Sequence, residues 1–327
     1  MRLNVAIFKF NLRALEPIIL PLYKGSTIRG GFGHAFRRVS CTMNNKECAD
    51  CLLKEKCAYS YVFETPLPAG TNIMRKYRSV PHPFVIEPPP ERRMGYKLDD
   101  EISFKLILIG KAIDYLPYFI YSFHELGDIG IGKGRGRYEL KSVEAFDTSD
   151  TGAKASKYIY NTETKVLKSF NSININIDTD MIGHESQGQD TKQLTINFET
   201  PTRISYNQHL TMDLEFHIFI RQLLRRLSLL SYFHCGDDKS GLNFKAVIKE
   251  AEGVKVDKQA LKWYDWERYS AKQNTRMKMG GFVGEITFKG NIEPFIPMIK
   301  AGEILHIGKG TSFGLGKYEI RVSDKML

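Results

Sequence analysis

The sequence lacks long hydrophobic runs, has only two tryptophans, and confines almost all of its five cysteines to one short segment. Its longest apolar runs, residues 104–110 and 216–220, are far shorter than the roughly 20 residues that span a bilayer. The N-terminal segment MRLNVAIFKFN carries charges within its apolar stretch and lacks a cleavage site of small residues. It therefore predicts a first strand rather than a secretion signal, and we expect a cytoplasmic protein without a membrane anchor.

Acidic residues are also in short supply, since 37 Asp and Glu stand against 47 Lys and Arg, a formal charge of +10. An excess of cations on this scale is typical of proteins that bind polyanions, because phosphate contacts release condensed counterions. A merely basic surface would explain the charge equally well. The 327 residues, 42% of them hydrophobic, are enough for a sizeable core and favour two domains over one.

Four of the five cysteines share one spacing pattern, C-x6-C-x2-C-x5-C, formed by Cys41, Cys48, Cys51 and Cys57. In a reducing compartment such a cluster more often holds a metal than a disulfide. Four thiolates leave no open coordination position on Zn²⁺, so the pattern predicts a structural zinc site. An iron–sulfur cluster would use the same ligands, and free thiols are a third reading. Cys235 is isolated and is expected to be free.

The chain is internally duplicated. The run GIGKGRGRYEL at 130–140 returns as IGKGTSFGLGKYEI at 307–320, and residues 136–139 match residues 316–319 at a constant offset. Each run follows a helical pattern and leads into a strand. In the first half, the expected elements are a strand, a helix, two strands, a helix and a strand at 3–12, 26–40, 59–64, 102–110, 113–126 and 137–143. In the second half, the corresponding segments are 193–199, 212–233, a strand within 254–264, then 282–289, 294–300 and 317–322.

This βαββαβ order predicts an α+β fold of two tandem ferredoxin-like, RRM-like domains with a Gly-rich loop near the C-terminus. The expected domains are residues 1–146 and 191–327. Residues 147–190, rich in Ser, Thr, Asn, Asp and Gly, are expected to form a linker. Within the linker, YIYNTETKVL at 158–167 resembles a hairpin.

These segments, above all residues 26–41, 263–273 and 305–320, resemble the CRISPR-associated repeat-processing endoribonucleases of the repeat-associated mysterious protein (RAMP) superfamily. The superfamily is marked by a Gly-rich loop between its last helix and last strand. The resemblance implies that this loop contacts RNA through Gly308, Lys309, Gly310, Thr311, Ser312, Gly314 and Gly316. Glycines let backbone N–H groups approach a phosphate closely, although a tight turn would need them for geometry alone. The first-half loop keeps Lys133 and Arg135 and could also face RNA.

The stretch WYDWERYSAKQNTRMKMGG at 263–281 interleaves aromatic and basic residues. Single-stranded RNA is bound by such sets, because aromatic rings stack on bases while cations meet phosphates. We expect Trp263 and Trp266 to pack inside the protein. We expect Arg268, Lys272 and Arg276 to touch RNA. The alternative is a pair of strands with solvated charges.

The resemblance also implies a reaction. In this family the RNA's own 2′-hydroxyl attacks the adjacent phosphate, which needs no metal and leaves a 2′,3′-cyclic phosphate and a 5′-hydroxyl. The protein supplies a proton acceptor, a proton donor and positive charge, and His is the usual agent near neutral pH. The family places a His on or near the first helix, and His34 matches best, with Tyr23 and Arg38 as its partners. His234 and His306 are the next candidates.

Related RAMP proteins bind crRNA without cutting it, so fold alone does not establish activity. The alternative function is a non-catalytic crRNA-binding subunit of a CRISPR interference complex. An iron–sulfur redox protein is a third and weaker reading. The expected partners are CRISPR repeat RNA or precursor crRNA and, in the second case especially, other CRISPR effector subunits.

Overall fold

The computed structural model describes residues 1–43, 47–68, 70–71, 79–147, 155–178, 192–236, 243–270 and 275–324. The chain divides into two compact units. One unit contains residues 4–174 and 233–235, and the other contains residues 1–3, 175–232 and 236–327. Among the described residues, every helix is too short or too polar to cross a bilayer.

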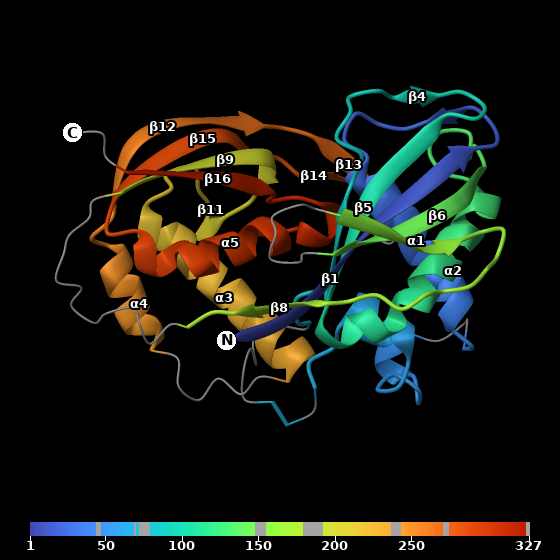
Figure 1. The fold of residues 1–327 in the computed structure, drawn as a ribbon, viewed down its shortest axis with the longest axis horizontal. Helices are drawn as coiled ribbons and strands as arrows, with labels where there is room; N and C mark the ends of the chain where they lie inside the picture. The colour runs from blue at the N-terminus through green and yellow to red at the C-terminus, as the bar shows by residue number, and fades with distance from the viewer. Residues whose placement is uncertain are drawn as a thin grey trace. The chain divides into compact units, whose positions relative to one another are not determined.

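The first unit is an antiparallel sheet with two helices against one face (Figure 1). Its strands are ordered β3-β5-β1-β6-β7, and β8 (Ile173–Asn176) also pairs with β1. The ordered strands are β3 (Phe84–Glu87), β5 (Glu101–Ile109), β1 (Arg2–Ala14), β6 (Tyr138–Asp147) and β7 (Ala155–Asn161). The main helices are α1 (Gly25–Ser40) and α2 (Leu116–Ile129).

Short elements complete the first unit: the two-stranded ribbon β2 (Ile18–Ile19) with β4 (Gly95–Tyr96), and the helical turns η1 (Cys48–Asp50), η2 (Ser60–Glu64) and η3 (Gly110–Tyr115). Alternate side chains of β1 face the helices. Phe10 stacks on its cross-strand partner Phe104 and also contacts Phe123 of α2. Phe32 of α1 stacks on Phe123 as well, which joins sheet and helices in one core.

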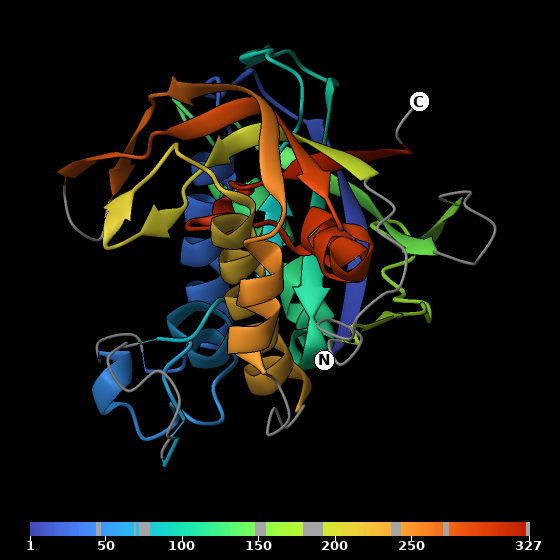
Figure 2. The same ribbon diagram turned by 90° about the vertical axis from the view of Figure 1, so that its left-hand side faces the viewer.

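The second unit repeats the plan with the strand order β12-β15-β9-β16. Its sheet contains β12 (Lys255–Tyr264), β15 (Gly281–Gly290), β9 (Lys192–Thr202) and β16 (Tyr318–Asp324). Its helices are α3 (Phe216–Cys235), α4 (Phe244–Ala251) and α5 (Ile296–Leu305), of which α3 and α5 run beneath the sheet (Figure 2). The remaining elements are β10 (Ser205–Tyr206), β11 (His209–Leu210), β13 (Glu267–Ser270), β14 (Thr275–Lys278), η4 (Glu293–Phe295) and η5 (Thr311–Phe313).

The predicted α+β fold of two tandem ferredoxin-like halves is confirmed. One strand was predicted wrongly, because residues 59–64 form the helical turn η2 and β3 takes the second strand position beside β5. Tyr59 and Phe63 stack with ring centroids 5.4 Å apart, four residues apart in sequence. Helical spacing lets both rings lie against the core.

The hairpin expected at 158–167 is also absent from the structure. Its first arm is the end of β7, which pairs with β6. The strand ends at Asn161, whose side-chain oxygen accepts hydrogen bonds from the backbone N–H and hydroxyl of Thr164. Such an Asx turn stops a strand. Residues 163–167 are exposed throughout, so they have no buried face that would favour a second arm.

Candidate functional site

Helix α1 turns one polar stripe to solvent. Gly30, His34 and Arg38 recur every four residues and are all exposed, while Phe32 and Phe36 between them are fully buried. A Cβ placed at Gly30 would meet nothing within 4 Å. Because residues four apart lie one above the other on a helix, open space borders His34 on the side of Gly30.

Two other glycines fix the orientation of this helix. A Cβ at Gly33 would lie 2.6 Å from the ring of Phe63 in η2, and one at Gly31 would lie 2.9 Å from Leu126 Cδ1 in α2. Glycine permits this close approach on both sides without displacing either neighbour. The helix is therefore held closely on two sides, and its remaining stripe, with His34, faces outward.

Arg38 lies one turn after His34 and is tied to the neighbouring helix. Its Nε atom is 2.9 Å from Glu125 Oε1 of α2, and its side chain is 65% exposed. An exposed pair of this kind contributes little to stability. It does hold the guanidinium close to the helix, with its charge partly balanced by the carboxylate.

Tyr23 is half-buried just before α1. Burial, and then the negative charge of Glu87, raise the pKa of its phenol well above the usual value. At neutral pH Tyr23 is therefore a hydrogen-bond donor and not a base. The first residue of α1 and His34 are separated by about 13 Å along the helix axis, so Tyr23 and His34 do not occupy adjacent turns.

The two alternative histidines are buried. His234 is 5% exposed, and its ring lies 3.0 Å from the Tyr61 hydroxyl through Nδ1 and 2.8 Å from the Pro81 carbonyl through Nε2. His306 is fully buried, and its Nδ1 is 3.1 Å from the Leu315 carbonyl. Neither imidazole is placed to meet a substrate from solvent, so both hold structure.

A different histidine gathers polar partners that the sequence pattern does not reveal. His82 is half-buried. Its Nε2 lies 3.5 Å from Arg29 Nη2 of α1, and its Nδ1 lies 3.4 Å from Thr65 Oγ1. Thr65 has a φ of 41°, a strained value for a β-branched residue. These residues are distant in sequence, and no local motif connects them.

The second-half glycine loop is built by its backbone. Gly308, Gly310, Gly314 and Gly316 all have φ between 75° and 82°. The Ile307 N–H donates to the Gly316 carbonyl over 3.0 Å, and the Lys309 N–H donates to the Arg203 carbonyl over 3.0 Å. A Cβ at Gly316 would lie 1.8 Å from the Ile307 oxygen. Turn geometry alone thus requires glycine there, as the alternative reading of the sequence held.

Exposure differs along this loop. Lys309 is exposed and its neighbours Gly308 and Gly310 are partly exposed, whereas Thr311 and Ser312 are buried at 7% and 4%. The short helix η5 begins at Thr311, where a helical turn leaves its first N–H groups without internal acceptors. The accessible part of the loop is therefore residues 308–310.

The β13–β14 ribbon packs on the same loop. The Arg268 guanidinium lies 4.8 Å from the centroid of the Phe313 ring, and its Nε is buried without a hydrogen-bond partner. Arg203 donates to the Lys278 carbonyl over 3.2 Å. Burial lowers the pKa of both arginines. The structure thus brings together two segments that the sequence assigned separately to RNA.

The structure describes the other residues predicted to contact RNA in this stretch only in part. Arg276 lies in β14, paired with Tyr269 of β13. Lys272 lies outside the described residues. Trp263 is 40% exposed, with its indole N–H donating to Asp265 over 2.8 Å, so the expectation that it packs inside was wrong, whereas Trp266 is half-buried. Trp263 lies on β12, where an exposed ring is available to a ligand.

The four clustered cysteines are half-buried free thiols on the segment between α1 and η2. Burial, Glu64, and the nearby Cys41 and Cys57 raise the pKa of Cys48, while Arg37 lowers it. Within the described ranges, no group of three or more His, Cys, Asp or Glu side chains is arranged to hold a metal ion. The zinc site therefore stays a prediction.

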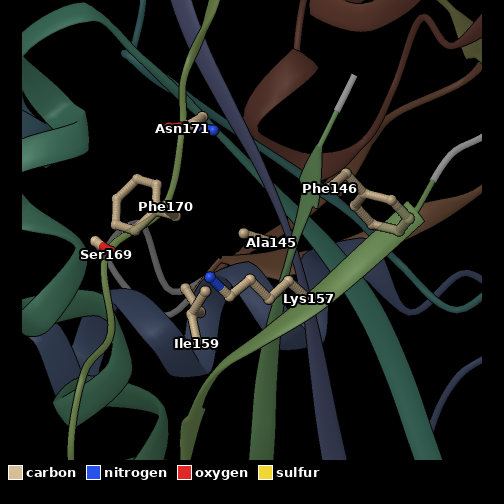
Figure 3. A pocket seen from close by; sticks show the side chains of 7 residues that line it. All are labelled: Ala145, Phe146, Lys157, Ile159, Ser169, Phe170 and Asn171. Atoms are coloured by element: carbon tan, nitrogen blue, oxygen red, sulfur yellow. The ribbon is translucent and has the colours of Figure 1, made fainter. Parts of the chain in front are cut away.

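The first unit also holds a small pocket of about 100 Å³, formed by β6, β7 and the segment that follows β7 (Figure 3). It is lined by Ala145, Phe146, Lys157, Ile159, Ser169, Phe170 and Asn171. This lining includes no histidine, cysteine or carboxylate, and none of it belongs to α1. The pocket is therefore separate from the candidate catalytic helix.

Comparisons with known proteins cover both halves. Residues 3–172 match the AF_1859_N model, described as an N-terminal domain, and residues 196–318 match the model for the CRISPR-associated endoribonuclease Cas6. An uncharacterized protein of Archaeoglobus fulgidus is 21% identical over 309 residues, covering 92% of this chain and 93% of that protein.

Two solved structures share the fold. A Cas6 product complex has a TM-score of 0.55 at 15% identity, covering 97% of this chain and 100% of that one. A partial Cas6-RT-Cas1–Cas2 complex has a TM-score of 0.54 at 14% identity, covering 99% of this chain and 47% of that one. At these identities the likeness establishes the fold of the chain.

Proposed function

Because the chain belongs to the family whose N-terminal domain model matches residues 3–172, and because residues 196–318 match the model for the Cas6 endoribonuclease, we propose that it processes CRISPR repeat RNA. The proposed reaction is the metal-independent cutting of precursor crRNA in the cytoplasm. The observation that carries the proposal is the exposed stripe of α1, with His34 beside the open space at Gly30.

The proposed chemistry needs few protein groups. The 2′-oxygen forms a bond to the adjacent phosphorus, its proton passes to a base, and the bond to the 5′-oxygen breaks as that oxygen gains a proton. The products are a 2′,3′-cyclic phosphate and a 5′-hydroxyl. His34 is the proposed proton-transfer residue, and a placed imidazole typically contributes about 10² to 10⁴ in rate.

Tyr23 and Arg38 have supporting parts in this proposal. The raised pKa of Tyr23 keeps its phenol protonated, so it orients or donates. Arg38 offers positive charge one turn from His34, although Glu125 shares that charge. Arg37, on the same last turn of α1, is a second nearby cation.

We assign RNA binding to the second-half loop and the β13–β14 ribbon. The exposed Lys309 offers a cation, and Gly308 and Gly310 leave the backbone open to a phosphate. Arg268 and Arg203 have pKa values lowered by burial, and an RNA phosphate nearby would compensate that cost. Thr311, Ser312, Gly314 and Gly316 then hold the loop in shape, and Lys272 and Arg276 are proposed as further RNA contacts.

Cleavage is tested by mixing repeat RNA with protein in the presence of chelator. The proteins compared are the parent, His34→Ala, and the control variant His82→Ala, which removes a different histidine of the first half. The expected result is cutting by the parent and by His82→Ala, a cyclic phosphate product, and no cutting of RNA carrying a 2′-deoxy nucleotide at the site. If the parent binds repeat RNA tightly and leaves it intact, the chain is instead a non-catalytic crRNA-binding subunit working with other CRISPR proteins.

We also propose that Cys41, Cys48, Cys51 and Cys57 bind a structural Zn²⁺. The support is their spacing and the placement of Cys48 close enough to Cys41 and Cys57 to interact electrostatically. Protein purified without chelator should carry about one zinc per chain. Less than about half an equivalent of any transition metal would contradict the site, and iron with sulfide would identify the alternative cluster.

A further inference from the structure

The first-half glycine loop, residues 130–136, repeats two backbone hydrogen bonds of the second-half loop. The Lys133 N–H donates to the Ile19 carbonyl over 2.9 Å, and the Ile131 N–H donates to the Gly136 carbonyl over 3.0 Å. Lys309 makes the equivalent bond to Arg203 in the second half over 3.0 Å. The two loops therefore hold their lysines in the same backbone setting.

The backbone angles agree as well. Three positions separated by 176 residues have positive φ in both loops: Gly130 and His306 at 84° and 60°, Gly132 and Gly308 at 77° and 81°, and Gly134 and Gly310 at 85° and 82°. Such angles favour glycine. Agreement of both hydrogen bonds and dihedral angles shows that residues 130–134 and 306–310 are structural equivalents.

The first-half loop is the more open of the two. Lys133, Gly134 and Arg135 are all exposed. A Cβ at Gly134 would meet nothing within 4 Å, whereas one at Gly310 would lie 2.8 Å from Leu315. The first-half loop is four residues shorter and contains no segment equivalent to η5. Its backbone and both cations are accessible to a ligand.

The local charge is unbalanced. Glu16 is the nearby carboxylate, and Arg137 holds it by an ion pair of 2.7 Å and a backbone N–H bond of 3.1 Å, which lowers the pKa of Glu16. Within the part of the chain that the structure describes, Lys133 and Arg135 have no carboxylate within 4 Å. Two neighbouring cations are thus left for an anionic ligand.

Exposed apolar side chains lie on and beside the ribbon that is bonded to this loop. The ribbon β2–β4, which projects beyond the sheet in Figure 1, is joined to the loop through the bond from Lys133 to Ile19. Ile19 is 49% exposed, Leu22 46% and Met94 49%. Apolar surface beside cations suits a ligand with alternating phosphates and flat apolar bases.

We propose that the loop 130–136 and the ribbon β2–β4 form a second RNA-binding site, at which Lys133 and Arg135 contact phosphates and Ile19 and Met94 contact bases. This inference rests on the proposed function, because the RNA that binds here is the one that the second-half loop binds. The first-half loop thereby extends the bound length of the RNA without taking part in cleavage.

The test measures the affinity of the full chain for repeat RNA across salt concentrations. The double variant Lys133→Ala/Arg135→Ala should lower the slope of log K against log salt by roughly 1.4 to 1.8, since each phosphate contact contributes about 0.7 to 0.9. The matched control, Lys245→Ala/Lys249→Ala, removes two exposed lysines from α4 and should keep the parental slope.

The possible outcomes separate the two proposals. If the parent does not bind repeat RNA, the proposed function fails. If the parent binds and Lys309→Ala weakens binding, but the double variant has the slope of the α4 control, the second site is refuted. Loss of an acidic protein partner by the double variant, with unchanged RNA affinity, would likewise refute it and assign this surface to protein.

Discussion

Helices α1 and α3 hold equivalent places at the start of the two halves, yet the protein uses them differently. Both contain an Arg-Arg-x-Ser sequence, at 37–40 and 225–228. In α1, Arg38 is exposed and pairs with Glu125. In α3, Arg226 is 8% exposed and donates to the Leu305 carbonyl over 2.9 Å, and burial lowers its pKa to about 9.

The same alignment sets His34 opposite Gln222, since each lies four residues before its arginine. Gln222 donates to the Ser205 carbonyl over 2.8 Å. The first half thus exposes the His34 imidazole on this helix. In the second half, the equivalent Gln222 amide is hydrogen-bonded to the backbone of the same unit. Duplicated folds commonly keep the scaffold while function resides in particular sites. The proposed cleavage site therefore lies in the first half.

The largest expected effect is the difference in cleavage rate between two alanine variants, one at His34 and one at Gln222. His34→Ala should lower the single-turnover cleavage rate by roughly 10² to 10⁴, because it removes the proposed proton-transfer group. RNA affinity should be nearly unchanged, since the phosphate contacts that dominate binding are proposed for other residues. Gln222→Ala should change the rate less than about threefold once both proteins are shown to be folded.

A different result would keep cleavage in the first half but move it away from His34. If His34→Ala cuts like the parent while His82→Ala is inactive, the catalytic group belongs to the cluster around Arg29 and Thr65. Rapid-quench kinetics with RNA fully bound separates this outcome from a loss of affinity.

Alanine substitutions at two glycines of α1 are expected to have an intermediate effect, which is on the free energy of unfolding. Gly33→Ala should lower the free energy of unfolding by about 1–3 kcal/mol, because its Cβ would lie 2.6 Å from the Phe63 ring and overpack the core. Gly30→Ala should raise it by about 0.5–1 kcal/mol, because alanine favours a helix and the position is open. Urea unfolding of both variants measures the difference, and equal shifts in one direction would contradict the packing described for α1.

Most of the fold could be predicted from the sequence, because its strands and helices have clear periodicity. The 16 residues of α1 and the long β1 were expected within two residues at each end. The turn η2 was not, because YSYVFE is a short apolar run that fits a strand or a helix equally well. Only its packing on the core, through Tyr59 and Phe63, decides between them.

The candidate site was less predictable, since it depends on burial and on contacts between distant segments. Sequence ranks His34, His234 and His306 by motif, but cannot show that the last two are buried. The contact between Arg268 and Phe313 joins residues 45 positions apart through tertiary packing. The His82 cluster has the same origin, and local patterns carry no signal for it.

The smallest expected effect concerns Tyr23, which has no counterpart assigned in the second half. Tyr23→Phe should lower the cleavage rate by less than about tenfold, because a phenol whose pKa is raised is no base at neutral pH and its proposed part is only to orient reacting groups.

The raised pKa of Tyr23 also predicts an effect on stability at high pH. The folded state keeps the proton that the unfolded chain releases near pH 10, so the contribution of Tyr23 is present below about pH 10 and is lost at higher pH. Tyr23→Phe should therefore lose stability less steeply than the parent above pH 10. A parallel loss in urea unfolding at pH 9 and pH 11 would show that Tyr23 is exposed enough to titrate normally.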